Sequence, residues 1–143
     1  MRLISLVEVY ELDHPDVPIT SLSTRAPVLG SNDLMIGGFI ITGSEPLTVV
    51  VRARGPSLAA SGIATPLANP SLQLIRASDN QTIASNDDWG TAPNAAQLTA
   101  SGYAPGYAQE SAVLITLPPG AYTALVSGSG GTTGLGIFEV FGL

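Results

Sequence analysis

The side chains that could carry chemistry in this sequence are few, and the clearest group of them is acidic. It consists of Asp79 and the run Asn86, Asp87 and Asp88. Closely spaced carboxylate and amide oxygens are the ligands that Ca²⁺ takes in proteins, so these four residues form a candidate calcium site. Asx turns use the same residue types without an ion, and both interpretations stay open. No cofactor other than calcium is indicated.

Catalytic chemistry has little support in this chain. His14 is the only histidine, and it lies in the proline-containing segment 14–18. A Ser/His/Asp triad or a histidine-based metal site needs a histidine held rigidly beside its partners. We therefore expect a protein that is not an enzyme.

Three aromatic side chains fall in one loop-rich region, at Trp89, Tyr103 and Tyr107. Such rings can form a platform for a sugar, which makes carbohydrate a possible partner. The same rings are also what a lid over the end of a β-sandwich requires. The sequence leaves both interpretations open.

Two glutamates lie inside apolar, strand-like segments rather than in a cleft. On an extended strand Glu139 shares a face with Ile137 and Phe141, so its carboxylate is flanked by apolar neighbours. A half-buried carboxylate needs a charged or hydrogen-bonding partner, although a solvated position at a sheet edge would also accommodate it. The expected charge pairs join Glu8 and Glu139 to Arg25, Arg52 and Arg54.

The two ends of the chain carry nearly the same strand. Residues 5–12, Ser-Leu-Val-Glu-Val-Tyr-Glu-Leu, match residues 136–143, Gly-Ile-Phe-Glu-Val-Phe-Gly-Leu, with Glu8 and Glu139 in register. A domain has one place for such a strand, so the second copy either adds to the same sheet, lies in a neighbouring subunit, or is left over from a preceding module of a tandem array. Glu-Val between apolar residues also arises readily by chance in a β protein, and this interpretation stays open. The residues expected at this strand-exchange interface are Leu6, Val7, Glu8, Val9, Tyr10 and Leu12.

Composition narrows the class of protein further. The chain has 143 residues, of which 45% are hydrophobic and only 11% charged, with 16 glycines and 11 prolines, a profile typical of an all-β domain. It has no lysine, five arginines and a net charge of −6, so nucleic-acid binding is not expected. No apolar run reaches membrane-spanning length, so membrane insertion is not expected either. Cysteine is absent, and disulfides are excluded.

The elements that must position these residues are short strands separated by turn signals about every ten residues. We expect strands near residues 3–12, 19–24, 34–42, 46–54, 71–77, 81–85, 111–117, 121–127 and 135–142. This predicts a jelly-roll-like β-sandwich of about eight or nine strands. Its domain would span residues 19–143, preceded by a strand arm at 1–13 and a stiff connector at 14–18.

Several local details follow from the turn residues. The strands at 34–42 and 46–54 are nearly continuous apolar runs, which predicts burial on both faces and a hairpin turn at 43–46. Pro119-Gly120 predicts a second hairpin with a type II turn. Short helical turns are expected at 57–62, capped by Ser57 and ended by Gly62, and at 94–100.

The sequence also resembles a known repeat module. The segments that carry the resemblance are Ser23-Thr24-Arg25, residues 36–43, residues 51–58, residues 84–89 and residues 119–128. Together they are similar to a tandem β-sandwich repeat of large secreted bacterial surface proteins, with Ser21 where the repeat usually has Asn. The second half is also similar to pre-peptidase C-terminal domains. The resemblance implies an extracellular or cell-surface location, and it brings no catalytic residue.

These observations together predict a structural protein. We expect a non-catalytic subunit or module that joins identical copies head-to-tail by β-strand addition, as a homopolymer or tandem array, in an extracellular fibre or surface layer. The alternative is a carbohydrate- or calcium-binding accessory module of a secreted protein.

Overall fold

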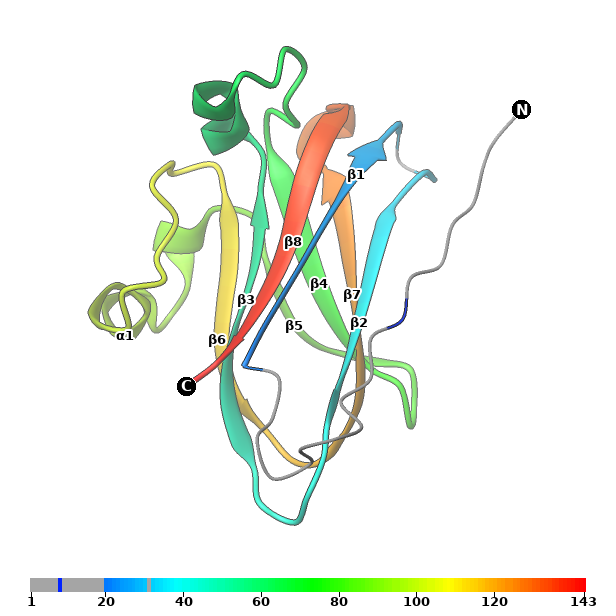
Figure 1. Ribbon diagram of the computed structural model, residues 1–143, viewed down its shortest axis with the longest axis vertical. Helices are drawn as coiled ribbons and strands as arrows, with labels where there is room; N and C mark the ends of the chain where they lie inside the picture. The colour runs from blue at the N-terminus through cyan, green and yellow to red at the C-terminus, as the bar shows by residue number, and fades with distance from the viewer. Residues whose placement is uncertain (1–7, 9–19, 31) are drawn as a thin grey trace.

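The chain folds into two antiparallel sheets packed face to face (Figure 1). The computed structural model describes residue 8, residues 20–30 and residues 32–143. The first sheet has the strand order β1-β8-β3-β6 and the second has the order β2-β7-β4-β5. The strands are β1 (Ser21–Val28), β2 (Met35–Ile41), β3 (Leu47–Arg54), β4 (Pro70–Arg76), β5 (Gln81–Asn86), β6 (Ser111–Leu117), β7 (Gly120–Gly128) and β8 (Gly134–Gly142). Eight strands in this order form a jelly-roll sandwich, which confirms the predicted fold class.

The core lies between the sheets and is built by alternation along each strand. Inward-facing side chains such as Val51, Leu72, Val126 and Phe138 are fully buried, while their neighbours in sequence face outward. The strands predicted from residue 34 onward match observed strands closely. The exception in the described part is the strand expected at 19–24, which runs from Ser21 to Val28 because its whole length pairs with β8.

A second, smaller core covers the outside of the first sheet. Val50 of β3, Ala112 of β6 and Leu98 are completely buried there, and Leu98 belongs to helix α1 (Ala95–Ala100). Helix α1 lies outside β6 in Figure 1. Because this segment covers β3, that strand is buried on both faces, as its apolar run predicted.

Strand β2 differs from the prediction of two buried faces. Met35, Gly37 and Ile41 are buried, but Ile36 and Ile40 are each 66% exposed. The reason is that no described segment covers the outer face of the second sheet at β2, whereas helix α1 and its neighbours cover the outer face of the first sheet at β3. An apolar run alone does not show which faces of a strand are covered.

Both predicted hairpins are wrong. The turn at 43–46 connects β2 to β3, and these strands belong to different sheets. The same holds for β6 and β7 on either side of Pro118 and Pro119, where Gly120 adopts φ 154° and pairs with Ile41 rather than forming a type II turn. The consecutive strands that do pair are β4 and β5, across the turn at 77–80.

The two short helical pieces occur where expected. A 3-10 helix, η1, covers Pro56–Ser61 and ends at Gly62 in the left-handed conformation. Ser57 does not cap it, because Ser57 lies inside the helix. The carboxylate of Glu110 serves instead, with Oε1 accepting hydrogen bonds from the backbone N–H of Gly55 (3.1 Å) and of Ser57 (2.9 Å). Two further 3-10 turns, η2 (Trp89–Thr91) and η3 (Ser129–Gly131), lie in the connecting loops.

The predicted arm at 1–13 and connector at 14–18 lie outside the described residues except for Glu8, which is exposed. In the described part of the chain, no helix is both long and apolar enough to cross a membrane.

Candidate functional site

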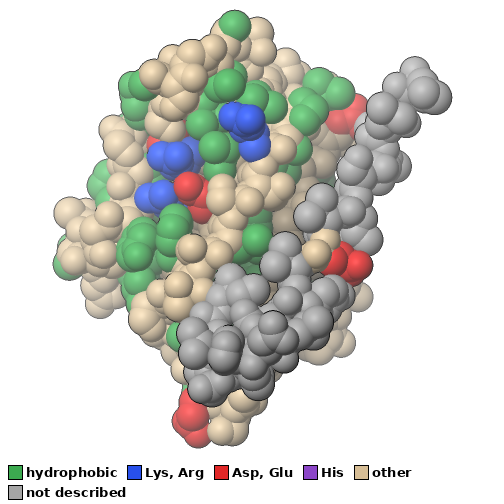
Figure 2. Space-filling view, in the orientation of Figure 1, with side chains coloured by type: hydrophobic (Ala, Val, Ile, Leu, Met, Phe, Trp, Pro, Cys, Tyr) green, Lys and Arg blue, Asp and Glu red, His purple; other side chains and the backbone are tan. Residues whose placement is uncertain are grey.

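The outer face of the first sheet carries a cluster of charged side chains. Strand register places Glu139 of β8 directly beside Arg52 of β3. Arg52 donates from Nε to Glu139 Oε2 over 2.9 Å, and its Nη2 lies 2.8 Å from the same oxygen. The side chains are only 13% and 11% exposed, so this is a largely desolvated ion pair. Figure 2 shows basic side chains gathered around an acidic one on this face.

Two more arginines complete the cluster in different ways. Arg54 Nε lies 3.0 Å from Glu139 Oε2, but it makes no hydrogen bond to that oxygen. Arg54 therefore contributes an ion pair alone. Arg25 faces Ile137 across β1 and β8, and Arg54 faces the same residue from β3. The expected pairing of Glu139 is thus found with Arg52 and Arg54, while Arg25 is an exposed neighbour of the pair.

Aromatic rings extend this cluster toward the covered part of the sheet. The rings of Tyr103 and Phe141 stack with centroids 4.5 Å apart, and the Arg52 guanidinium lies 4.8 Å from the Phe141 centroid. Arg52 Nη1 also donates to the carbonyl oxygen of Tyr103 over 2.9 Å. Arg52 is therefore held by a carboxylate, a carbonyl and a ring, which fixes its position.

The proposed calcium ligands do not come together as a group of four. Asp79 lies in the turn before β5, and Asp87 and Asp88 follow its other end, so roughly 20 Å of extended strand separates them. Asp79 accepts a hydrogen bond from Arg76 Nε over 3.0 Å. This bond lowers the pKa of the Asp79 carboxyl. The calcium prediction therefore reduces to Asn86, the last residue of β5, and the two aspartates that follow it.

Two of the remaining three side chains, those of Asn86 and Asp87, are engaged by neighbouring groups. Asn86 Oδ1 accepts from the backbone N–H of Ala112 (3.0 Å), and Asn86 Nδ2 donates to the carbonyl of Asp88 (3.1 Å). Asp87 Oδ2 accepts from the Ser129 hydroxyl at 2.8 Å. These bonds tie the loop after β5 to β6 and to η3, as Asx-type loops do. Among the described residues, no three His, Cys, Asp or Glu side chains are grouped so that they could hold a metal ion.

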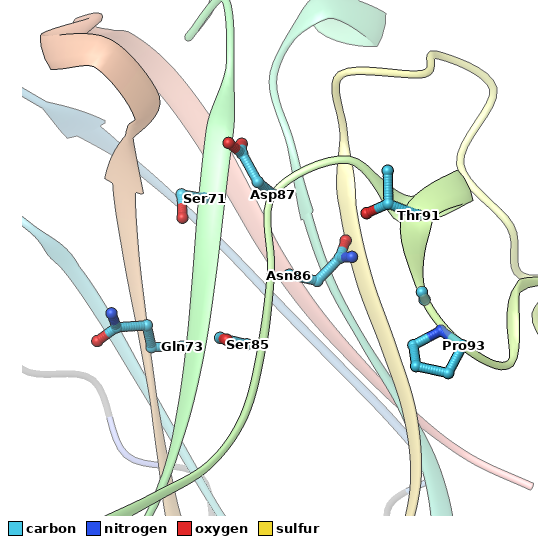
Figure 3. A pocket seen from close by; sticks show the side chains of 8 residues that line it. Ser71, Gln73, Ser85, Asn86, Asp87, Thr91 and Pro93 are labelled. Carbon is cyan, nitrogen blue, oxygen red and sulfur yellow. The ribbon is translucent and has the colours of Figure 1, made fainter.

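A polar hollow opens beside this loop (Figure 3). It has a volume of about 340 Å³, and its floor is made by side chains that face outward from β4 and β5. The lining residues are Ser71, Gln73, Ser85, Asn86, Asp87, Thr91, Ala92 and Pro93. Hydroxyl and amide groups predominate, so the hollow suits a neutral hydrogen-bonding ligand better than a metal ion.

The three loop aromatics do not form one platform. Trp89 and Tyr103 pack against the second core cluster, where they cover Val50 and Ala112. Tyr107 is 45% exposed and stands apart from that cluster. Trp89 and Tyr103 therefore act as a lid over the second core cluster, and Tyr107 takes no part in it.

Sequence reasoning missed Glu110. It is completely buried, and besides its two bonds to η1 its backbone carbonyl accepts from the N–H of Trp89 over 2.9 Å. Ser111, also buried, donates to the carbonyl of Pro70. The available signal was an acidic residue immediately before an apolar strand. The expected strand-exchange residues Leu6, Val7, Val9, Tyr10 and Leu12 lie outside the described residues.

Comparison with known proteins identifies the fold. Scans against protein-family models and a search of curated proteins give no match. Among solved structures, the chain is similar to the pre-peptidase C-terminal domain of a collagenase from Bacillus anthracis, with a TM-score of 0.52. The sequence identity is 13%, and the match covers 85% of this chain and 89% of the other. At this identity the likeness shows the shared β-sandwich fold alone, which agrees with the sandwich fold predicted from sequence.

Proposed function

We propose that this chain is a non-catalytic structural module that is joined to other domains of the same fold in an extracellular protein assembly. The joint is a β-strand formed by residues 3–12, which enters the sheet of a neighbouring domain through its backbone and the apolar side chains of Leu6, Val7, Val9 and Tyr10. Repeated head-to-tail, this contact builds a fibre or a surface array.

The observation that supports this proposal is the position of β8. The twin of residues 5–12 lies inside the first sheet, hydrogen-bonded to β1 on one side and to β3 on the other. The described residues Ser21–Gly142 supply four strands to each of the two sheets. Because β8 already occupies the position between β1 and β3, a second strand of this sequence would take that position only in another domain.

An extracellular location is part of the proposal. The similar solved domain is described as part of a collagenase, and a low content of charged residues without lysine or cysteine suits a secreted surface protein.

The test compares the whole chain with a variant lacking residues 1–13. We expect the deletion to leave the thermal midpoint unchanged and to abolish species larger than the monomer in size-exclusion chromatography with light scattering and in negative-stain micrographs. A clear fall in the midpoint would show that the segment belongs to its own domain. If the whole chain and the truncated variant have the same molar mass per monomer count in solution, residues 1–13 do not join copies of the protein. Either result overturns the proposal.

A second candidate function is carbohydrate binding by the hollow beside β5. Its outward hydroxyl and amide side chains, including Ser71, Gln73 and Ser85, are suited to hydrogen-bond a neutral sugar. Isothermal titration calorimetry with neutral oligosaccharides tests it, with Gln73→Ala as the disruptive variant. Heats unchanged by that variant would exclude the hollow.

A further inference from the structure

Three of the five arginines of the chain lie together on the outer face of the first sheet, at positions 25, 52 and 54. One carboxylate, that of Glu139, lies among them. Three guanidinium groups and one carboxylate leave two positive charges uncompensated, in a chain whose net charge is −6. Figure 2 shows basic side chains open at the surface of this face. The cluster is therefore a positive spot on an acidic protein.

The donors of this cluster are divided between the protein and its surroundings. Arg52 directs Nε, Nη1 and Nη2 to Glu139 and to the carbonyl oxygen of Tyr103, so its donors are occupied. Arg54 lies beside the same carboxylate, but its Nε makes no hydrogen bond and its side chain is 27% exposed. Arg25 is exposed, and within the described part of the chain it has no ion pair. The donors open to a ligand are therefore those of Arg25 and Arg54.

Strand register places these two arginines on either side of one apolar residue. Both pair with Ile137 of β8, Arg25 from β1 and Arg54 from β3. Neighbouring strands lie about 4.8 Å apart, so the two Cα atoms are about 10 Å apart. An arginine side chain is longer than half of that distance, and both guanidinium groups can reach one anion above Ile137. The ion pair with Glu139 orders Arg54 before a ligand arrives, which lowers the entropy cost of binding.

The surroundings of the two arginines suit an acidic sugar better than a protein surface. The centre of a protein–protein interface is depleted of charged residues. Here the centre is charged, and the strongly exposed large apolar side chains of the described residues all lie outside β1, β3 and β8. Ser21 and Ser23 lie on the same exposed side of β1 as Arg25 and offer hydroxyl groups for hydrogen bonds. A carboxylate matches the planar fork of an arginine.

We propose that Arg25 and Arg54 bind the carboxylate of an acidic oligosaccharide, a chain of uronic acid units, on the outer face of the first sheet. The carboxylate lies between the two guanidinium groups over Ile137, and Ser23 hydrogen-bonds to the sugar. Glu139 is a positioning residue, because it holds Arg54 and does not touch the ligand. The site goes beyond the proposed function, since it needs neither self-association nor the polar hollow on the second sheet.

Isothermal titration calorimetry of the whole chain with tetragalacturonate at low ionic strength tests this site. The control ligand is the methyl ester of the same tetramer, which keeps the sugar hydroxyls and loses the charge. We expect the acid to bind and the ester to bind about tenfold more weakly or not at all. Salt at about 1 M, where the Debye length falls to about 3 Å, should also weaken binding of the acid.

Variants of the protein identify the residues that bind. Arg25→Gln should weaken binding of the tetramer about tenfold and leave the thermal midpoint unchanged, because Arg25 is exposed without an ion pair. Arg25→Lys keeps the charge without the fork and should lose less. Arg54→Gln should also weaken binding, and its thermal midpoint reports separately on the lost contact with Glu139. Arg76→Gln is the matched control, since this arginine is paired with Asp79 on the second sheet, and it should leave the affinity unchanged.

Several results overturn the inference. They are no binding of the tetramer, equal affinity for the acid and its ester, or an affinity that Arg25→Gln leaves unchanged. Loss of binding with Gln73→Ala would place the ligand in the hollow instead. Tighter binding of tetraglutamate than of tetragalacturonate would assign the arginines to an acidic protein partner. None of these measurements depends on self-association, so failure here is distinct from failure of the light-scattering test of the proposed function.

Discussion

Phe138 and Gly37 face each other across the core so closely that position 37 has no room for a methyl group. The two residues lie on β8 and β2, in opposite sheets, and are 101 positions apart in the chain. Their contact joins the two sheets across the core.

A double-mutant cycle should show this coupling in the natural chain. We expect Phe138→Val to cost about 2 to 3 kcal/mol through the cavity it opens. Gly37→Ala alone should cost about 1 to 3 kcal/mol through overpacking. The double variant should be more stable than the sum predicts, by about 1 kcal/mol or more, as measured by urea unfolding. Additive effects would show that the residues do not share one space.

Replacement of Glu139 should destabilise the domain strongly. Glu139→Gln removes the charge that compensates Arg52 and Arg54, and we expect a cost of about 3 kcal/mol because the pair is largely desolvated. Glu45→Gln, at an exposed turn position, is the matched control and should change stability by about 0.5 kcal/mol or less. Equal effects for the two variants would show that Glu139 is effectively solvated.

Glu110 should be more sensitive than any acidic residue at the surface. Glu110→Ala leaves the N–H groups of Gly55 and Ser57 without an acceptor inside the protein, at a cost of about 3 kcal/mol. Glu110→Gln retains an acceptor oxygen and should lose less. Gln109→Ala, at an exposed neighbouring position, serves as the control in the same unfolding experiment. A small loss for Glu110→Ala would contradict its role as the cap of η1.

The ion pair of Asp79 with Arg76 predicts a defined pH dependence. The hydrogen bond from Arg76 holds the pKa of Asp79 below its ordinary value of 3.8. A depressed carboxyl pKa stabilises the folded state above the unfolded pKa, and this contribution is lost as the pH falls through the folded pKa. The stability difference between the natural chain and Asp79→Asn should therefore be constant above about pH 4 and disappear at lower pH. A difference that persists in strong acid would exclude the pair as its cause.

Calcium should have no effect on stability if hydrogen bonds within the protein already satisfy the loop after β5. Asp87 accepts a hydrogen bond from Ser129, and the side-chain amide of Asn69, oriented with its nitrogen toward Asp87, donates to the other carboxylate oxygen over 3.2 Å. A bound ion would stabilise the folded state by mass action, so we expect the same melting curve with chelator and with millimolar Ca²⁺. A higher midpoint in calcium that Asp87→Asn abolishes would restore the metal site.

The sequence alone determined the class of fold and the approximate strands. Alternation of apolar residues between Gly and Pro signals is a local property, so strands such as those at Leu47–Arg54 and Ser111–Leu117 could be predicted from their own residues. The sequence also predicted that Glu139 needs an arginine, because a carboxylate among apolar neighbours cannot be left alone. Which arginine it meets depends on register between strands 87 positions apart.

Only the tertiary structure decided the partners. The turns at 43–46 and 118–119 look like hairpin turns in sequence, but whether the next strand pairs with its neighbour or crosses to the other sheet depends on which faces must be buried together. The same holds for Glu110, whose role follows from where η1 begins, and for Gly37, whose lack of a side chain matters only because Phe138 is opposite. Local sequence encodes the alternation of side chains along a strand and the positions of turns. The pairing of distant residues follows from packing the whole core at once.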